Sequence, residues 1–437
     1  MIIHMHYPHR CLLLLLLASA SHVPPATAET PAPEQSRWQS LANPSAPGSL
    51  APRLVQAGDG TVYLSWLQKH TARASASADK TRHTLKFARL QDTADKTSFL
   101  SARSIASGSD WFANWADTPA LHIHSDKLWL AHWLQKSASS TYAYDIMLSL
   151  SKDQGATWSQ AFSPHQDNTP TEHGFVSYFP MAKDRSGMIW LDGRETQETH
   201  ETQKSQASHD HGGSMTLRTA EVDSAGNISQ SALIDQRVCD CCQTAAVSTS
   251  GATVIAYRNR TKDEIRDIAI MRRDAQGWSE PVIVHHDNWR ISACPVNGPA
   301  LAARGRQLAV AWFTMAEDKP RIHLALSSDA GETFSAPQTF ASGTALGRVQ
   351  LLQHADGWLL SWMDQPATGT AAVIRLAGLN ADGSVRWQQE LRGASAQRSS
   401  GIPRIAALAD GRIIMAWTAA DNGQSVIATS VFAPGHE

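Results

Sequence analysis

Four of the five cysteines are the residues of this 437-residue chain whose types and spacing most clearly suggest chemistry. Three of them fall within a stretch of four residues and the fourth follows later; they are Cys239, Cys241, Cys242 and Cys294. In an oxidising compartment an even number of cysteines usually forms disulfides. One bridge would join Cys294 to Cys239 or a neighbouring cysteine, and the remaining pair would form a second bridge. A vicinal Cys241–Cys242 bond is one form of that second bridge.

The same cysteines are also suited to binding a metal ion. A Cys-x-Cys-Cys run is poor geometry for two unstrained disulfides, because bridged residues must meet at defined separations. As thiolates, the four would bind a soft ion such as copper(I), or zinc, with His173 or the His285–His286 pair as further ligands. A histidine-rich stretch, His209-Asp210-His211, lies in a polar segment from about Glu195 to Gly213, which is predicted to be a loop insertion with adventitious metal binding as the alternative. Two disulfides and a copper or zinc site both remain open.

A second set of candidates combines arginines with an acid. Asp117, Arg194, Arg258 and Arg290 all fall in polar segments between apolar runs. An arginine binds a carboxylate through paired hydrogen bonds and an aspartate can transfer a proton, so this set suits a carboxylated or polyhydroxylated ligand. The alternative is a solvated polar rim without a ligand. Which of these is right depends on whether the fold brings the four side chains to one face.

The elements that must position these residues come from a repeat that runs through the chain. A short apolar strand, a tight turn and a second apolar strand ending in a bulky residue recur about every 50 to 65 residues, a period typical of propeller blades. Most copies end on tryptophan. The pattern predicts an all-β protein, a single β-propeller of four-stranded antiparallel blades. The seven copies span Pro52–Trp66, Pro119–Trp133, Pro180–Trp190, Thr244–Tyr257, Pro299–Trp312, Val349–Trp362 and Pro403–Trp417.

Seven copies favour seven blades, with six as the alternative. Because the last copy ends in a single strand, Ser425–Phe432, we expect the N-terminal stretch Trp38–Leu41 to supply its outer strand and close the ring. If each blade runs A to D in antiparallel order, the loops before strand A and between strands B and C share one face. The cysteines, Asp117 and the three arginines fall in such loops, so the sequence places them around one mouth of the propeller.

Two turns of the repeat carry a more specific pattern. They read Ser151-Lys152-Asp153-Gln154-Gly155-Ala156-Thr157-Trp158 and Ser327-Ser328-Asp329-Ala330-Gly331-Glu332-Thr333-Phe334. Aspartate and serine can bond the backbone of a turn, glycine adopts a positive φ, and the aromatic ring packs into the blade. The pattern resembles the Asp-box, or bacterial neuraminidase repeat, of the sialidase-like β-propellers. The resemblance covers nearly all of the chain after its leader at the level of fold, and it implies a structural role for these turns.

The resemblance also implies glycan chemistry at the central mouth. In sialidases three arginines hold the substrate carboxylate, an aspartate is the acid and base, and a tyrosine paired with a glutamate is the nucleophile. Here Pro52-Arg53-Leu54 stands in place of the Arg-Ile-Pro motif of the first blade, and the last tyrosine is Tyr257, far from the end of the chain. We therefore expect a propeller that binds or processes a glycan or small acidic ligand. The two departures argue against sialidase activity itself. If it is an enzyme, it would be an exo-glycosidase of sialidase type. The alternative is a propeller that binds copper, zinc or a partner protein through its cysteines.

The N-terminus and the net charge of the chain indicate where the protein acts and which partners it disfavours. Arg10 precedes the apolar run Leu12–Leu17, and Ala26-Thr27-Ala28 supplies a small-x-small cleavage pattern, which predicts a signal peptide over residues 1–28 and a propeller over residues 29–437. The run is shorter than the about 20 residues that a membrane anchor needs. Lys and Arg number 38 against 40 Asp and Glu, a net charge of −2 that disfavours nucleic-acid binding. We expect a monomer in the periplasm or secreted, without membrane insertion and without a required cofactor.

Overall fold

The computed structural model describes residues 37–70, 81–93, 96–181, 184–196, 213–365 and 371–434. Residues 37–437 form one compact unit. Two predictions from the sequence, the signal peptide over residues 1–28 and the loop that contains His209-Asp210-His211, lie outside the described residues. Within the described residues, no helix is long and apolar enough to cross a membrane.

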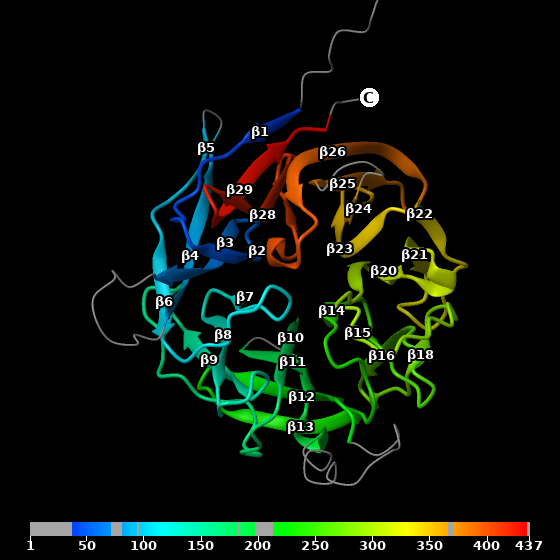
Figure 1. The fold of residues 1–437 in the computed structure, drawn as a ribbon, viewed down its shortest axis with the longest axis horizontal. Helices are drawn as coiled ribbons and strands as arrows, with labels where there is room; N and C mark the ends of the chain where they lie inside the picture. Colours follow the sequence, from blue (N-terminus) through cyan, green and yellow to red (C-terminus); the bar gives the residue numbers. More distant parts are fainter. Residues whose placement is uncertain are drawn as a thin grey trace, which may run out of the picture. The chain divides into compact units, whose positions relative to one another are not determined.

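Seven antiparallel sheets follow one another around a ring (Figure 1). The described part of the chain contains strands and three short 3-10 helices but no α-helix. The fold is therefore an all-β propeller with seven blades, as the seven copies of the repeat predicted. The strands of blades 1 to 3 are β2 (Ser49–Gln56), β3 (Val62–His70), β4 (Arg82–Asp92), β5 (Thr97–Phe99), β6 (Arg103–Gly108), β7 (Ala120–Ser125), β8 (Leu128–Lys136), β9 (Tyr144–Ser151), β10 (His173–Pro180), β11 (Arg185–Asp192), β12 (Thr216–Asp223) and β13 (Ile228–Asp235).

The same arrangement continues through the second half of the chain. Blade 4 contains β14 (Ala245–Ser248), β15 (Thr253–Arg258), β16 (Ile268–Asp274), β17 (Gly277–Trp278) and β18 (Val282–Ile283). Blade 5 contains β19 (Ala300–Arg304), β20 (Gln307–Thr314), β21 (Arg321–Ser327) and β22 (Gln338–Ser342). Blade 6 contains β23 (Ala345–His354), β24 (Gly357–Asp364), β25 (Ala371–Leu379) and β26 (Val385–Ser395), and blade 7 contains β27 (Arg404–Ala407), β28 (Ile413–Asp421), β29 (Gln424–Phe432) and β1 (Trp38–Ser40). The 3-10 helices are η1 (Arg194–Thr196), η2 (Ala316–Asp318) and η3 (Arg398–Ser400).

The N-terminal strand closes the ring. β1 pairs antiparallel with β29, and Trp38 lies opposite Phe432. The two rings are 5.1 Å apart between centroids. This pairing confirms the prediction for Trp38–Leu41, and it covers the edge that β29 would otherwise expose.

The core lies between neighbouring blades. The second strand of most blades carries a tryptophan, and Trp66, Trp190 and Trp312 are fully buried. Trp312, for example, packs with Val254 and Ile270 of the preceding blade. Burial of a large apolar side chain stabilises a fold by about 2 to 3 kcal/mol, so these repeated residues hold each sheet against the next.

The inner strand of the third blade begins earlier than the repeat predicted. The sequence pattern placed this strand from Pro180 onward, whereas β10 starts at His173 and ends at Pro180. A β-bulge between Gly174 and Ser177, where Phe175 has a φ of 55°, breaks the alternation on which the prediction relied. Proline ends the strand here, since it lacks the amide that a further ladder bond would need.

The two Ser-x-Asp-x-Gly-x-Thr turns share one hydrogen-bond pattern. Ser151 Oγ donates to Asp153 Oδ1 (2.8 Å) and accepts from the Gly155 amide (2.8 Å). Thr157 donates to the Asp153 carboxylate from its amide (2.8 Å) and its hydroxyl (2.6 Å). The corresponding bonds join Ser327, Asp329, Gly331 and Thr333. Each turn follows the third strand of its blade and is satisfied internally, which is typical of a structural turn.

Candidate functional site

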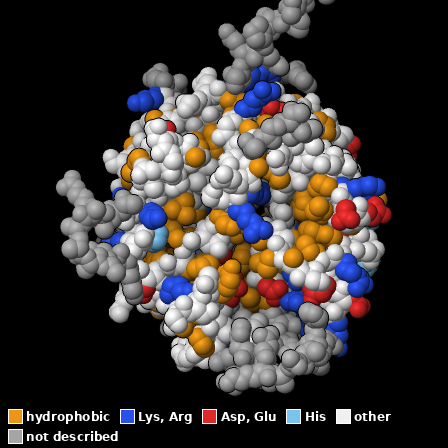
Figure 2. All heavy atoms as spheres, in the orientation of Figure 1, with side chains coloured by type: hydrophobic (Ala, Val, Ile, Leu, Met, Phe, Trp, Pro, Cys, Tyr) orange, Lys and Arg blue, Asp and Glu red, His pale blue; other side chains and the backbone are white. Residues whose placement is uncertain are grey.

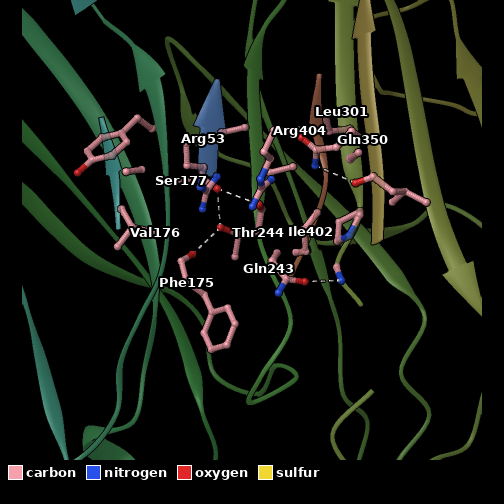
Figure 3. A pocket seen from close by; sticks show the side chains of 18 of the residues that line it. Arg53, Phe175, Val176, Ser177, Gln243, Thr244, Leu301, Gln350, Ile402 and Arg404 are labelled. Carbon is pink, nitrogen blue, oxygen red and sulfur yellow. Dashed lines mark hydrogen bonds between the residues drawn. The ribbon is translucent and has the colours of Figure 1, made fainter. Parts of the chain in front are cut away.

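A cavity of about 270 Å³ lies at the centre of the propeller, where the inner strands of all seven blades meet. Its wall is formed by β2, β7, β10, β14, β19, β23 and β27, or by residues directly before them. In Figure 2, Lys and Arg side chains lie beside hydrophobic ones around the hollow at the centre of the face. Figure 3 shows Arg53 and Arg404 inside the cavity, above Ser177 and Thr244.

Arg53 and Arg404 form no ion pair with any carboxylate of the described residues. Arg404 is 7% exposed, and its Nε atom has no hydrogen-bond partner in the described part of the chain. Burial and the neighbouring Arg53 charge lower the pKa of Arg404 well below the usual arginine value. Arg53 donates from Nε to Thr118 Oγ1 (3.1 Å), and burial lowers its pKa to about 10, although the Asp117 charge opposes this. Arg404 is buried and Arg53 is half-buried, and neither forms an ion pair within the described residues, so this pair of like charges is suited to binding an anion.

A third arginine of the cavity, Arg348, is engaged by the protein itself. Its guanidinium donates to Ser400 Oγ (2.6 Å) and to the carbonyl oxygens of Gly401 (2.9 Å) and Gln397 (3.0 Å). It also lies over the Trp115 ring at 5.3 Å. Arg348 therefore anchors the loop around η3 at the cavity through both terminal nitrogens of its guanidinium, and it adds positive charge there.

Asp117, Tyr144 and Glu172 form a cluster in which the tyrosine hydroxyl lies between the two carboxyl groups. The Tyr144 hydroxyl lies 3.0 Å from Asp117 Oδ2 and 2.6 Å from Glu172 Oε1, and the Phe175 amide donates to Asp117 Oδ1 (2.8 Å). Since the hydroxyl has one proton, it can donate to one carboxyl at a time, and the other contact is favourable when that carboxyl is itself protonated. Burial raises the pKa of Asp117 to about 7 and that of Glu172 to about 8. Asp117 lines the cavity and the other two do not, so Asp117 is the group that can exchange a proton with a ligand.

The backbone at Gly174 permits this arrangement. A Cβ atom at this position would lie 1.8 Å from Asp117 Oδ2 and 3.1 Å from the Tyr144 ring. Because real Cβ atoms do not approach other atoms so closely, any larger residue would displace the carboxyl. Gly174 and the bulge that follows it therefore set the position of the acid.

A network of charges behind Glu172 holds the start of β10. His173 is fully buried, and its Nε2 lies 3.1 Å from Asp167 Oδ2 and 3.6 Å from Asp192 Oδ1. Burial lowers the pKa of His173, but hydrogen bonds to carboxylates raise it to about 9, so that it is protonated at neutral pH. Arg194 donates two bonds of 2.7 Å to Asp192. His173, Asp167 and Asp192 are close enough to share a metal ion, but these bonds already satisfy them, and the network positions Glu172.

None of the three arginines singled out from the sequence lines the cavity. Arg194 is held in the network behind Glu172. Arg258 is fully buried, donates to three backbone carbonyl oxygens, and lies over the Trp289 ring at 4.9 Å. Arg290 is exposed. Of the four predicted residues, the structure brings Asp117 to the cavity, and it uses Arg194 and Arg258 to hold the surrounding loops.

The four cysteines come together where blades 4 and 5 meet. Cys239 and Cys242 form a disulfide. Cys241 and Cys294 are free thiols whose side chains interact, and Cys241 Sγ lies 4.0 Å from Cys239 Sγ. The four cysteines thus lie close together, as their equivalent positions in neighbouring blades predicted. One bridge is formed, and it is not the vicinal one.

Arginines lie against this cysteine cluster. Arg266 donates from Nη1 to Cys239 Sγ (3.5 Å). The interaction with Cys241 and the charges of Arg266 and Arg260 lower the pKa of Cys294, although burial and the Asp240 charge oppose this. The same interaction and burial raise the pKa of Cys241. Exposed Cys294 is therefore the more readily ionised of the two thiols.

The cysteine cluster also has donor atoms that are suited to copper or zinc, the alternative to two disulfides. The sulfur atoms of Cys239, Cys241 and Cys242 lie within 4.8 Å of one another. A donor set made only of sulfur suits copper(I) or zinc, once the disulfide is reduced. His173, considered as a further ligand, belongs to the carboxylate network instead. A copper or zinc site here stays a prediction.

The sequence did not single out the cavity residues Arg404 and Arg348, or Tyr144 behind the cavity. It identified Arg53 only as a departure from the sialidase motif. A signal for two of them exists, because Pro52-Arg53-Leu54 and Pro403-Arg404-Ile405 are the same element of the repeat in its first and last copies. In a closed ring these two copies must be neighbours.

No protein-family model matches this sequence, and no curated protein sequence does either. Solved structures that resemble it include a sialidase variant from Streptococcus pneumoniae, with 12% identity, a TM-score of 0.45, and coverage of 91% of this chain and 93% of that one. An intramolecular trans-sialidase from Ruminococcus gnavus has 11% identity and a TM-score of 0.44, with coverage of 88% and 94%. An α-L-arabinanase from Penicillium chrysogenum has 12% identity and a TM-score of 0.44, with coverage of 90% and 98%. The sheets of this chain by themselves show a β-propeller with seven blades.

Proposed function

We propose that this protein binds an acidic glycan, or a similar small carboxylated ligand, in the central cavity. The observation that carries the proposal is the pair Arg53 and Arg404, two neighbouring guanidiniums, one half-buried and one buried, that form no ion pair with a carboxylate of the described residues. A ligand carboxylate between them would supply the missing counter-ion and accept charge-assisted hydrogen bonds. The expected export of the chain through its N-terminal leader would place this site outside the cytoplasm.

Asp117 gives the site a means of processing the ligand. A carboxyl with a pKa of about 7 is protonated in a large fraction of molecules near neutral pH, as a general acid must be. Tyr144 is fully buried behind Asp117, which supports a positioning role and not attack on a ligand. Glycan recognition with acid assistance by Asp117 is therefore favoured over the tyrosine-nucleophile mechanism of sialidases.

Isothermal titration calorimetry with paired sugars tests the binding proposal. Sialic, glucuronic and galacturonic acids would each be compared with a neutral sugar of the same size. We expect at least one acid to bind while its neutral partner does not, and Arg404→Met to weaken that binding roughly tenfold or more, since a hydrogen bond to a charged group contributes about 1.5 to 3 kcal/mol. Arg392→Met is the control, because Arg392 is highly exposed and lies outside the cavity.

Two results would overturn the proposal. One is the absence of binding for every acid by a folded protein. The other is an acid that binds equally well to wild type and Arg404→Met. Turnover of fluorogenic glycosides, lost in Asp117→Asn, would add the catalytic role.

A further inference from the structure

The four sulfur atoms between blades 4 and 5 are arranged in order of exposure. Cys294 is exposed and Cys241 is half-buried, whereas Cys239 and Cys242 are 0% and 2% exposed. The Cys294 side chain interacts with that of Cys241, and Cys241 Sγ lies 4.0 Å from Cys239 Sγ of the disulfide. The four cysteines therefore lead from the surface to a buried disulfide, with Cys294 outermost.

We propose that Cys294 and Cys241 are the nucleophilic and the resolving cysteine of a thiol–disulfide exchange site that acts on external disulfides of small thiols. Cys294 sulfur attacks one sulfur of the external disulfide, forms a mixed disulfide, and releases the first thiol. Cys241 sulfur then attacks Cys294, forms a Cys241–Cys294 bond, and releases the second thiol. The external disulfide gains two electrons and two protons, and the two cysteines lose them.

The contact between Cys241 and Cys239 adds an internal exchange. Attack of Cys241 on Cys239 releases Cys242, and attack of Cys294 on Cys241 then releases Cys239. The bond moves from Cys239–Cys242 to Cys241–Cys294 without a change in the overall oxidation state. One disulfide is thereby shared between a buried pair and a pair that reaches solvent.

The charges beside the cysteines favour this chemistry. Arg266, whose side chain is 3% exposed, donates to Cys239 Sγ and is itself held by Glu264 at 2.8 Å. Arg260 pairs with Asp240, inside the Cys-x-Cys-Cys run, at 2.9 Å. A guanidinium stabilises the thiolate that attacks or leaves during exchange. These groups are distinct from Arg53 and Arg404, so the inference is independent of the ligand of the central cavity.

Trapping with oxidised glutathione tests the proposal. The protein, lightly reduced with a dithiol and desalted, would be mixed with oxidised glutathione, quenched with acid, alkylated and mapped by peptide mass. Wild type is expected to gain a Cys241–Cys294 bond and release two molecules of glutathione. Cys241→Ser is expected to stop at a glutathione adduct on Cys294, and Cys294→Ser to form neither product.

The double variant Cys239→Ser/Cys242→Ser is the matched control. It should keep the reaction with glutathione and lose the internal exchange. Should Cys241→Ser fail to fold, alkylation rates in wild type decide, because Cys294 must then react roughly tenfold or more faster than Cys241.

Three results would overturn the proposal. The first is a mixed disulfide that persists in wild type as long as in Cys241→Ser. The second is a Cys241–Cys294 bond that excess reduced glutathione does not open, which would make it a structural brace. The third is a bound copper or zinc ion that blocks reaction of the thiols until a chelator removes it.

Discussion

Arg404 lies beside Arg53 in the central cavity, although the two residues come from the last and the first blades of the propeller. The pairing of β1 with β29 closes the ring and makes these blades neighbours. Each arginine follows a proline at the same place in the repeat. The same Pro-Arg element therefore occurs on both sides of the seam, the place where the first and last blades meet. It brings two like charges together, an unfavourable contact that a bound anion would relieve.

Arg404→Met should stabilise the protein and weaken binding of the acidic ligand roughly tenfold or more. Methionine fills a similar volume without a buried charge, and replacing buried charged groups by well-packed apolar ones is often stabilising by about 1 to 4 kcal/mol. Urea denaturation monitored by tryptophan fluorescence measures the free energy of unfolding. A loss of stability of about 2 kcal/mol or more would mean that the Arg404 charge is satisfied within the fold, and it would count against an anion site.

The stability of the protein should fall as pH rises through neutrality. The folded-state pKa values of Asp117 and Glu172, about 7 and about 8, lie above their ordinary values. These two carboxyls therefore bind more protons in the folded state than in the unfolded state between about pH 4 and pH 8, and each lowers the free energy of unfolding by at most about 1.4 kcal/mol per pH unit. Burial lowers the pKa of His122 and of His132 to about 3, which acts in the opposite direction below about pH 6.5. The net decline is therefore expected in the window between about pH 6.5 and pH 8. Asp117→Asn removes one of the two groups, so urea titrations across this window should show a shallower decline.

The control for this pH effect is Asp263→Asn, which changes an exposed aspartate. It should leave the slope of wild type unchanged. A slope in Asp117→Asn as steep as in wild type would show that Asp117 is ionised in the folded protein at low pH.

Gly174→Ala should displace the acid and destabilise the fold. The new Cβ would overlap Asp117 Oδ2 at 1.8 Å, and overpacking of this kind typically costs about 1 to 3 kcal/mol. Gly58→Ala is the matched control, because no atom lies within 4 Å of the Cβ position there. If the Gly174 variant kept both the stability and the ligand affinity of wild type, the position of Asp117 would not depend on this contact.

Trp38→Ala should weaken the closure of the ring. Trp38 packs on Phe432 across the seam, so its removal should lower the free energy of unfolding by about 1 to 3 kcal/mol. Thermal unfolding compares it with Tyr142→Ala, whose ring is 58% exposed. Equal melting temperatures for the two variants would contradict a stabilising role for the seam.

Most of the fold was predictable because its determinants are local. The tryptophan-ended strands, the turns at Asp153 and Asp329, and the closing strand at Trp38 all follow from short patterns of apolar residues and turn formers. The prediction was wrong at β10, where the bulge after Gly174 interrupts the alternation of apolar residues. A bulge depends on its partner strand, which a local pattern does not contain.

The sequence by itself determined the blades, favoured seven of them over six, and predicted the meeting of four cysteines, since each depends on the spacing of residues within a repeat. Only the tertiary structure decided which charged groups face the centre. Arg194 and Arg258 are turned into the loops that they hold, whereas Arg404 meets Arg53 across the seam and Asp117 meets Tyr144. These contacts join residues that are distant in the chain, and the closure of seven blades around one axis brings them together.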